Sequence, residues 1–145
     1  MREECRVVFF FLQKISPPSF LHFFFFFFFN LTMSLLSESL GLSLWEASTS
    51  GDASAVKKLL QTPGINVNWE DERLKRSPIY RAAGHGRVGV VKALLADHRV
   101  QVNHQQSQGG TALGVACQQG FTEVVKLLLA DPHIEVQAVF CSFVP

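Results

Sequence analysis

The sequence repeats itself every 34 or 35 residues between Leu44 and Gln137. Seven positions of one copy recur 34 residues later: Ala82, Gly86, Val90, Val91, Leu94, Leu95 and Val102 return as Ala116, Gly120, Val124, Val125, Leu128, Leu129 and Val136. A shift of 35 residues toward the N-terminus finds the pattern once more. The three units are Leu44–Asn68, Ser77–Asn103 and Thr111–Gln137. Because this period is typical of repeat proteins, the sequence predicts a stack of similar units.

Each unit is predicted to form two short helices. In the second unit, Ser77 is a suitable N-cap and Pro78 fits the first helical position, where its missing N–H costs nothing. We expect Gly86 to end the first helix in the left-handed conformation. The second helix should begin at Val88, with an apolar stripe at i, i+3 and i+4 formed by Val91, Leu94 and Leu95.

These units resemble the ankyrin repeat. The segment Ser77–Leu95, S-P-I-Y-R-A-A-G-H-G-R-V-G-V-V-K-A-L-L, is similar to the signature T-P-L-H-x-A-A-x-x-G-H-x-x-V-V-x-L-L-L, and so is Thr111–Leu129. Leu44–Leu60 lacks the Thr-Pro opening, as an N-terminal capping repeat would. The resemblance implies an all-α ankyrin-repeat solenoid of stacked helix-turn-helix units with short hairpin loops, within residues 38–137.

The sequence departs from the family pattern at several positions. The histidine that follows the Thr-Pro-Leu opening is replaced by Trp45, Tyr80 and Gly114 in the three units. The glycine expected in the hairpin turn is Lys75 before the second unit, whereas Gly109 is present before the third.

The resemblance implies a non-enzymatic scaffold that binds a protein partner on a groove formed by its hairpin tips and first helices. Carried over to matching positions, the partner-binding residues are expected at the tips and at the ends of the first helices: Arg73, Leu74, Arg76, Ser107 and Gln108, then His85, Gln118 and Gln119. Between Arg73 and Arg99 there are seven basic residues and one acidic residue. This excess is either a patch for an acidic or phosphate-bearing partner or a set of ordinary solvated side chains.

Other functions find no support in the sequence. A net charge of +1 argues against nucleic-acid binding. The histidines lack metal-ligand spacing, and Cys117 is interpreted as a buried apolar residue facing the stack. We therefore expect no catalytic residues, no metal, no cofactor and no small-molecule substrate, and a cytoplasmic location.

Residues 1–37 form a Phe-rich, low-complexity leader outside the repeats. Eleven of the 14 phenylalanines lie within the first 29 residues, and residues 15–37 contain no charged side chain. One interpretation is a translated pyrimidine tract, with Met33 as the true start and residues 1–32 an artefact of the gene model. The alternatives are a cleaved signal peptide and a membrane segment at residues 19–36 that tethers the repeats to a bilayer.

Residues 138–145 form an apolar tail, A-V-F-C-S-F-V-P. The tail either folds back over the third unit or marks a chain cut short from a longer array, and we favour truncation. The protein would then be a fragment of a larger ankyrin-containing protein. Poor solubility or self-association is expected of a chain with this apolar end.

Overall fold

The computed structural model describes residues 18–136, with side chains from Phe25 onward. Within this range the chain is helical, with no strand. The helices are α2 (Pro18–Ser50), α3 (Ala53–Leu60), α4 (Pro78–Gly84), α5 (Val88–Leu95), α6 (Ala112–Gln119) and α7 (Thr122–Leu129). The expected all-α class is confirmed, and the second helix of the second unit begins at Val88 as predicted. The fate of the tail after Gln137 lies outside the described residues.

The chain divides into two units between Leu36 and Ser37. In the first unit, the described side chains belong to α2, and the large apolar ones are exposed: Phe25, Phe26, Phe27, Phe28, Phe29, Leu31, Met33, Leu35 and Leu36. Polar side chains here bond back to the helix, since Asn30 Nδ2 donates to the carbonyl of Phe26 and Thr32 Oγ1 to that of Phe28. The part of the chain that the structure describes contains one helix, within Phe25–Ser50, that is long and apolar enough to cross a membrane.

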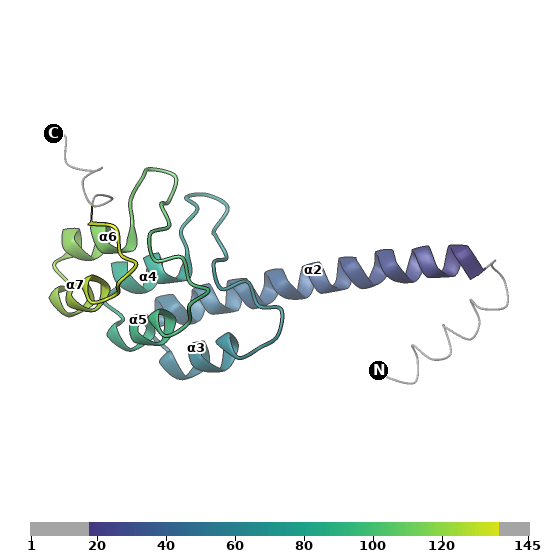
Figure 1. Cartoon of the computed structure of the whole chain (residues 1–145), viewed down its shortest axis with the longest axis horizontal. Helices are drawn as coiled ribbons and strands as arrows, with labels where there is room; N and C mark the ends of the chain where they lie inside the picture. The colour runs from purple at the N-terminus through teal and green to yellow at the C-terminus, as the bar shows by residue number, and fades with distance from the viewer. Residues whose placement is uncertain (1–17, 137–145) are drawn as a thin grey trace. The chain divides into compact units, whose positions relative to one another are not determined.

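The second unit contains the stacked helix pairs. The end of α2 and α3 form the first repeat, α4 and α5 the second, and α6 and α7 the third. Along the stack α4 packs against α6, while α5 packs against both α3 and α7. Figure 1 shows these neighbours, with the hairpin loops between repeats standing next to one another. This order confirms the predicted solenoid.

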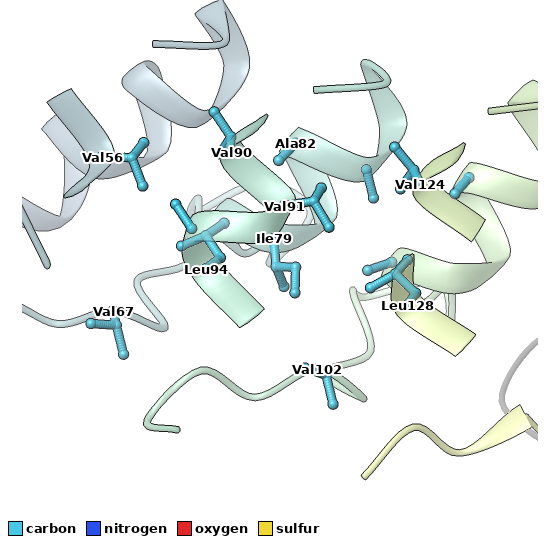
Figure 2. Packing of buried hydrophobic residues seen from close by; sticks show 14 of the residues in the cluster. Val56, Val67, Ile79, Ala82, Val90, Val91, Leu94, Val102, Val124 and Leu128 are labelled. Atoms are coloured by element: carbon cyan, nitrogen blue, oxygen red, sulfur yellow. The ribbon is translucent and has the colours of Figure 1, made fainter. Parts of the chain in front are cut away.

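The core runs through all three repeats because equivalent apolar positions are buried in each. Val56 and Val91 occupy one such position in the first and second repeats, Val90 and Val124 occupy another in the second and third, and all four are fully buried. Leu94 and Leu128 occupy another, and Figure 2 shows them on successive second helices. Each repeat therefore buries apolar surface against its neighbours as well as between its own two helices.

Two asparagines join the loops that follow the second helices. Asn68 Nδ2 donates to the carbonyl of Arg99 (2.8 Å), and its Oδ1 accepts from the N–H of Gln101 (2.8 Å). One repeat further on, Asn103 makes the same pair of bonds, to the carbonyl of His133 and the N–H of Glu135. These side chains satisfy backbone groups that no strand pairing satisfies.

The turns within each repeat follow the expected chemistry with one exception. Gly86 (φ 65°) and Gly120 (φ 77°) are left-handed after the first helices. Thr111 Oγ1 accepts from the N–H of Gly114 and caps α6. Ser77 occupies the same N-cap position at α4 but makes no capping bond, and its buried Oγ has no partner within the described residues.

The prediction that Cys117 is buried is wrong, because its side chain is exposed. The equivalent residue of the second repeat, Ala83, is fully buried. The difference arises because α6 packs against α4 and covers this position, whereas no described residue covers the equivalent position on α6, where Cys117 is exposed. Val102 and Val136 differ for the same reason, at 8% and 55% exposed.

Candidate protein-binding surface

The hairpin that precedes the second repeat is held together by Asp71. Its carboxylate accepts hydrogen bonds from the backbone N–H groups of Leu74 and Arg76, and it pairs with the Arg76 guanidinium (Nη2–Oδ2 3.4 Å). Burial raises the pKa of the Asp71 carboxyl, but these hydrogen bonds and the positive charge of Arg76 outweigh burial. The pKa therefore lies below its ordinary value of 3.8. The hairpin tip is thus a fixed feature of the surface.

The two hairpin tips touch. The backbone N–H of Ser107 donates to the carbonyl of Leu74 (2.9 Å). The ring Nε2 of His104 lies 2.9 Å from the carbonyl oxygen of Lys75 and 3.4 Å from Glu70 Oε1. Residues far apart in sequence therefore form one continuous edge, which is visible as the paired loops in Figure 1.

The structure separates the predicted tip residues into two groups. The side chains of Arg73, Ser107 and Gln108 are exposed and open to a partner. Leu74 and Arg76 are half-buried, and the Arg76 guanidinium is already engaged by Asp71. Arg76 thus stabilises its own hairpin, a role that the sequence did not indicate.

The predicted residues at the ends of the first helices are all exposed: His85 after α4, and Gln118 and Gln119 in α6. The His85 ring Nδ1 lies 2.9 Å from the carbonyl oxygen of Arg81. Because α4 packs against α6, these helix ends lie on neighbouring elements of the same stack.

A group of side chains that sequence reasoning missed lies between the first and second repeats. The Arg81 guanidinium carbon is 4.6 Å from the centre of the Trp45 ring, and its Nε donates to Thr49 Oγ1 (3.3 Å). Trp45 Nε1 donates to the carbonyl of Arg76 (3.1 Å), and Trp69 meets the Trp45 ring edge-on, at 6.2 Å between centroids. The available signal was Trp45 itself, a large aromatic residue in the family's histidine position.

Arg81 has no acidic partner among the described residues. Burial lowers the pKa of its guanidinium below the ordinary value. The positive charge of Arg76 lowers that pKa further, while the negative charge of Asp71 acts in the opposite direction. Arginine stays protonated regardless, so Arg81 is a half-buried cation with an unbalanced charge.

Within residues 18–136, no group of three or more histidine, cysteine, aspartate or glutamate side chains is arranged to hold a metal ion. The surface offers instead paired hairpin tips, exposed helix ends and a cationic aromatic cluster. Such a surface suits the recognition of another macromolecule.

Comparison with known proteins agrees with this architecture. The sequence profile of ankyrin repeats matches residues 44–138, in three copies. This chain belongs to the ankyrin-repeat family. Its repeats are thus of a kind that generally mediates protein–protein interaction and is generally non-enzymatic.

Several curated relatives share the repeats. The chain is 30% identical over 103 residues to the nuclear factor NF-kappa-B p105 subunit of Gallus gallus, an alignment that covers 69% of this chain and 10% of the relative. It is 34% identical over 79 residues to the 26S proteasome non-ATPase regulatory subunit 10 of Dictyostelium discoideum, covering 54% and 34%. A protein of Oryza sativa named as a probable E3 ubiquitin-protein ligase, XBOS32, is 32% identical over 102 residues, covering 67% and 20%. The chain thus spans about a third or less of each of these three relatives.

Proposed function

We propose that the ankyrin-repeat domain of this chain is a non-enzymatic, intracellular scaffold that binds a protein partner across its hairpin tips and the ends of its first helices. The observation that carries the proposal is the bond between Ser107 and Leu74, which joins the two tips. Because the tips are joined and α4 packs against α6, a partner meets one continuous surface rather than separate loops.

The exposed residues on this surface support a binding role. Arg73, Ser107, Gln108, Gln118 and Gln119 present polar groups to solvent, free to bind a partner's polar groups and backbone. The opposite side of the stack, formed by the second helices, exposes ordinary charged side chains such as Lys92 and Glu123. This difference gives a matched set of positions for an experiment.

Site-specific photo-crosslinking tests the proposal. A photoreactive amino acid placed at Gln108 or Gln118 of the full chain should crosslink a partner protein in cells of the native source. The same amino acid at Lys92 or Glu123 serves as the control and should give no product with that partner. Crosslinks that arise only from Lys92 and Glu123 would place the partner on the second helices and contradict the proposal.

A second candidate function is supported by α2: residues 19–36 tether the repeats to a membrane. These 18 residues carry no charge and span about 27 Å as a helix, close to the thickness of a bilayer's hydrocarbon core. The large apolar side chains described there are exposed, and Asn30 and Thr32 bond to the helix's own carbonyls. Polar groups satisfied in this way are tolerated within lipid.

Carbonate extraction of the protein from its native source tests the tether. An anchored chain stays with the membrane pellet, and Phe27→Arg with Leu31→Arg should release it, because each arginine costs about 3 kcal/mol near the bilayer centre. The control Ser39→Arg lies outside residues 19–36 and should leave the protein in the pellet. Release of the unmodified chain by carbonate would rule out the tether.

A further inference from the structure

The Arg81 side chain is held in place by two different contacts. Its guanidinium lies over the Trp45 ring at 4.6 Å, and its Nε donates to Thr49 Oγ1. Trp45 is in turn fixed by its bond to the Arg76 carbonyl and by its edge contact with Trp69. A guanidinium stacked on an immobilised ring loses little conformational entropy when it binds a ligand.

Within the described residues, no ion pair compensates the positive charge of Arg81. The carboxylate of Asp71 is engaged by the Arg76 guanidinium. Arg87 adds a further cation, whose Nε donates to the carbonyl of Thr49 rather than to an acid. Glu46, next to Trp45 in α2, is exposed and forms no ion pair within the described residues. The immediate surroundings of Arg81 therefore favour an anion.

The hydrogen-bond donors of Arg81 point to the kind of anion. A guanidinium has five N–H groups, and the only Arg81 side-chain donor with a described acceptor is Nε. The Nη groups are left to form the two parallel bonds by which arginine binds a carboxylate. A carboxylate placed there would balance a half-buried charge, an interaction stronger than a fully solvated ion pair.

We propose that Arg81, stacked on Trp45, binds an aspartate or glutamate side chain of an acidic segment in the protein partner. This inference rests on the proposed scaffold function and adds the chemistry of the partner. The basic stretch from Arg73 to Arg99, with seven basic residues and one acidic residue, extends the same complementarity. The chain's net charge of +1 makes a nucleic acid a poor alternative, because phosphate-backbone binding relies on a large positive charge.

A selection from a library of random 16-residue peptides displayed on phage provides the probe. The full chain, kept in a non-ionic detergent, should enrich peptides rich in aspartate and glutamate. Each acid of the tightest peptide is then changed to its amide, and the Kd values are measured on three proteins: the unmodified chain, Arg81→Gln and the control Lys92→Gln. Lys92 carries the same charge but lies on the second helix α5.

One acidic residue of the peptide should couple to Arg81. Its change to the amide should weaken binding about 10-fold or more on the unmodified chain and on Lys92→Gln, and less than about 2-fold on Arg81→Gln. The amide peptide should bind Arg81→Gln and the unmodified chain with similar Kd values, which shows that the variant is folded.

Three results would overturn the inference. Peptides that crosslink at Gln108 but show no acid coupled to Arg81 would contradict it and leave the scaffold function intact. The absence of any enriched peptide would count against both. A phosphoserine in place of the coupled acid that binds more than about 10-fold tighter would identify phosphate, not carboxylate, as the preferred anion.

Discussion

Lys75 and Gly109 occupy the same position in successive hairpins, and both have a positive φ, 55° at Lys75 and 81° at Gly109. The hairpin before the second repeat thus keeps the backbone shape of the hairpin before the third, although it has lysine where the other has glycine. A left-handed conformation costs an L-amino acid about 1–2 kcal/mol, a strain that the Asp71 bonds across the same hairpin offset.

Exchanging these two residues should move stability in opposite directions. Lys75→Gly relieves the strain at the cost of a more flexible unfolded chain, so we expect a net gain of about 0.5–1 kcal/mol in the free energy of unfolding. Gly109→Lys introduces the strain and should lose about 1 kcal/mol or more. Urea unfolding monitored by circular dichroism measures both. A Lys75→Gly protein that is less stable than the unmodified chain would show that the hairpin is not strained.

The repeats could be predicted from sequence because each helix carries its own pattern. The left-handed turn at Gly86 follows from the preference for glycine after the end of a helix, and the start of α5 at Val88 follows from the apolar stripe of that helix. Contacts between repeats could not be predicted in this way. The stacking of Arg81 on Trp45 depends on how two units face each other, and nothing in the spacing of 36 residues encodes it.

The sequence pattern also could not predict which side chains are exposed at the end of the stack. Ala83 and Cys117 hold equivalent positions, and the pattern assigns both to the interior. Whether such a position is buried depends on the unit that follows it. The third repeat covers Ala83, whereas no described residue covers Cys117. The binding role of Arg73, Gln108 and the other tip residues stays a prediction.

Substitutions at Ala83 and Cys117 should reveal this difference. Ala83→Gln forces a larger polar side chain between α4 and α6 and should cost about 2–3 kcal/mol of stability. Cys117→Gln changes an exposed position and should stay within about 0.5 kcal/mol of the unmodified chain. Thermal unfolding separates the two. Equal losses would mean that the Cys117 face is covered in solution.

The hydrogen bonds that the side chains of Asn68 and Asn103 make between loops, here called the asparagine bridges, should contribute equally to the free energy of unfolding. Asn68→Ala leaves the carbonyl of Arg99 and the N–H of Gln101 without their partner, and Asn103→Ala does the same to His133 and Glu135. Each should cost about 1–2 kcal/mol, because these backbone groups remain partly accessible to water.

The control is Gln105→Ala, which removes an exposed side chain from the loop that contains Asn103, with an expected change below about 0.5 kcal/mol. Amide hydrogen exchange at Gln101 and Glu135 should accelerate only in the matching asparagine variant. Unchanged exchange in both variants would show that the bridges do not hold the loops.

The hydrogen bonds and the ion pair of Asp71 should make the free energy of unfolding depend on pH in the acid range. The pKa of the Asp71 carboxyl is lowered in the folded state, so its contribution is complete well above the ordinary pKa of 3.8 and is lost as the pH falls through the lower folded value. Asp71→Asn removes the charge and one strong acceptor, and should cost about 1–2 kcal/mol at pH 7. Its deficit relative to the unmodified chain should shrink between pH 5 and about pH 2, because the native carboxyl is then protonated as well. Glu72→Gln changes the same charge at the neighbouring exposed position and should show no such convergence. A deficit for Asp71→Asn that is constant over this range would mean that the hairpin relies on the shape of the side chain and not on its charge.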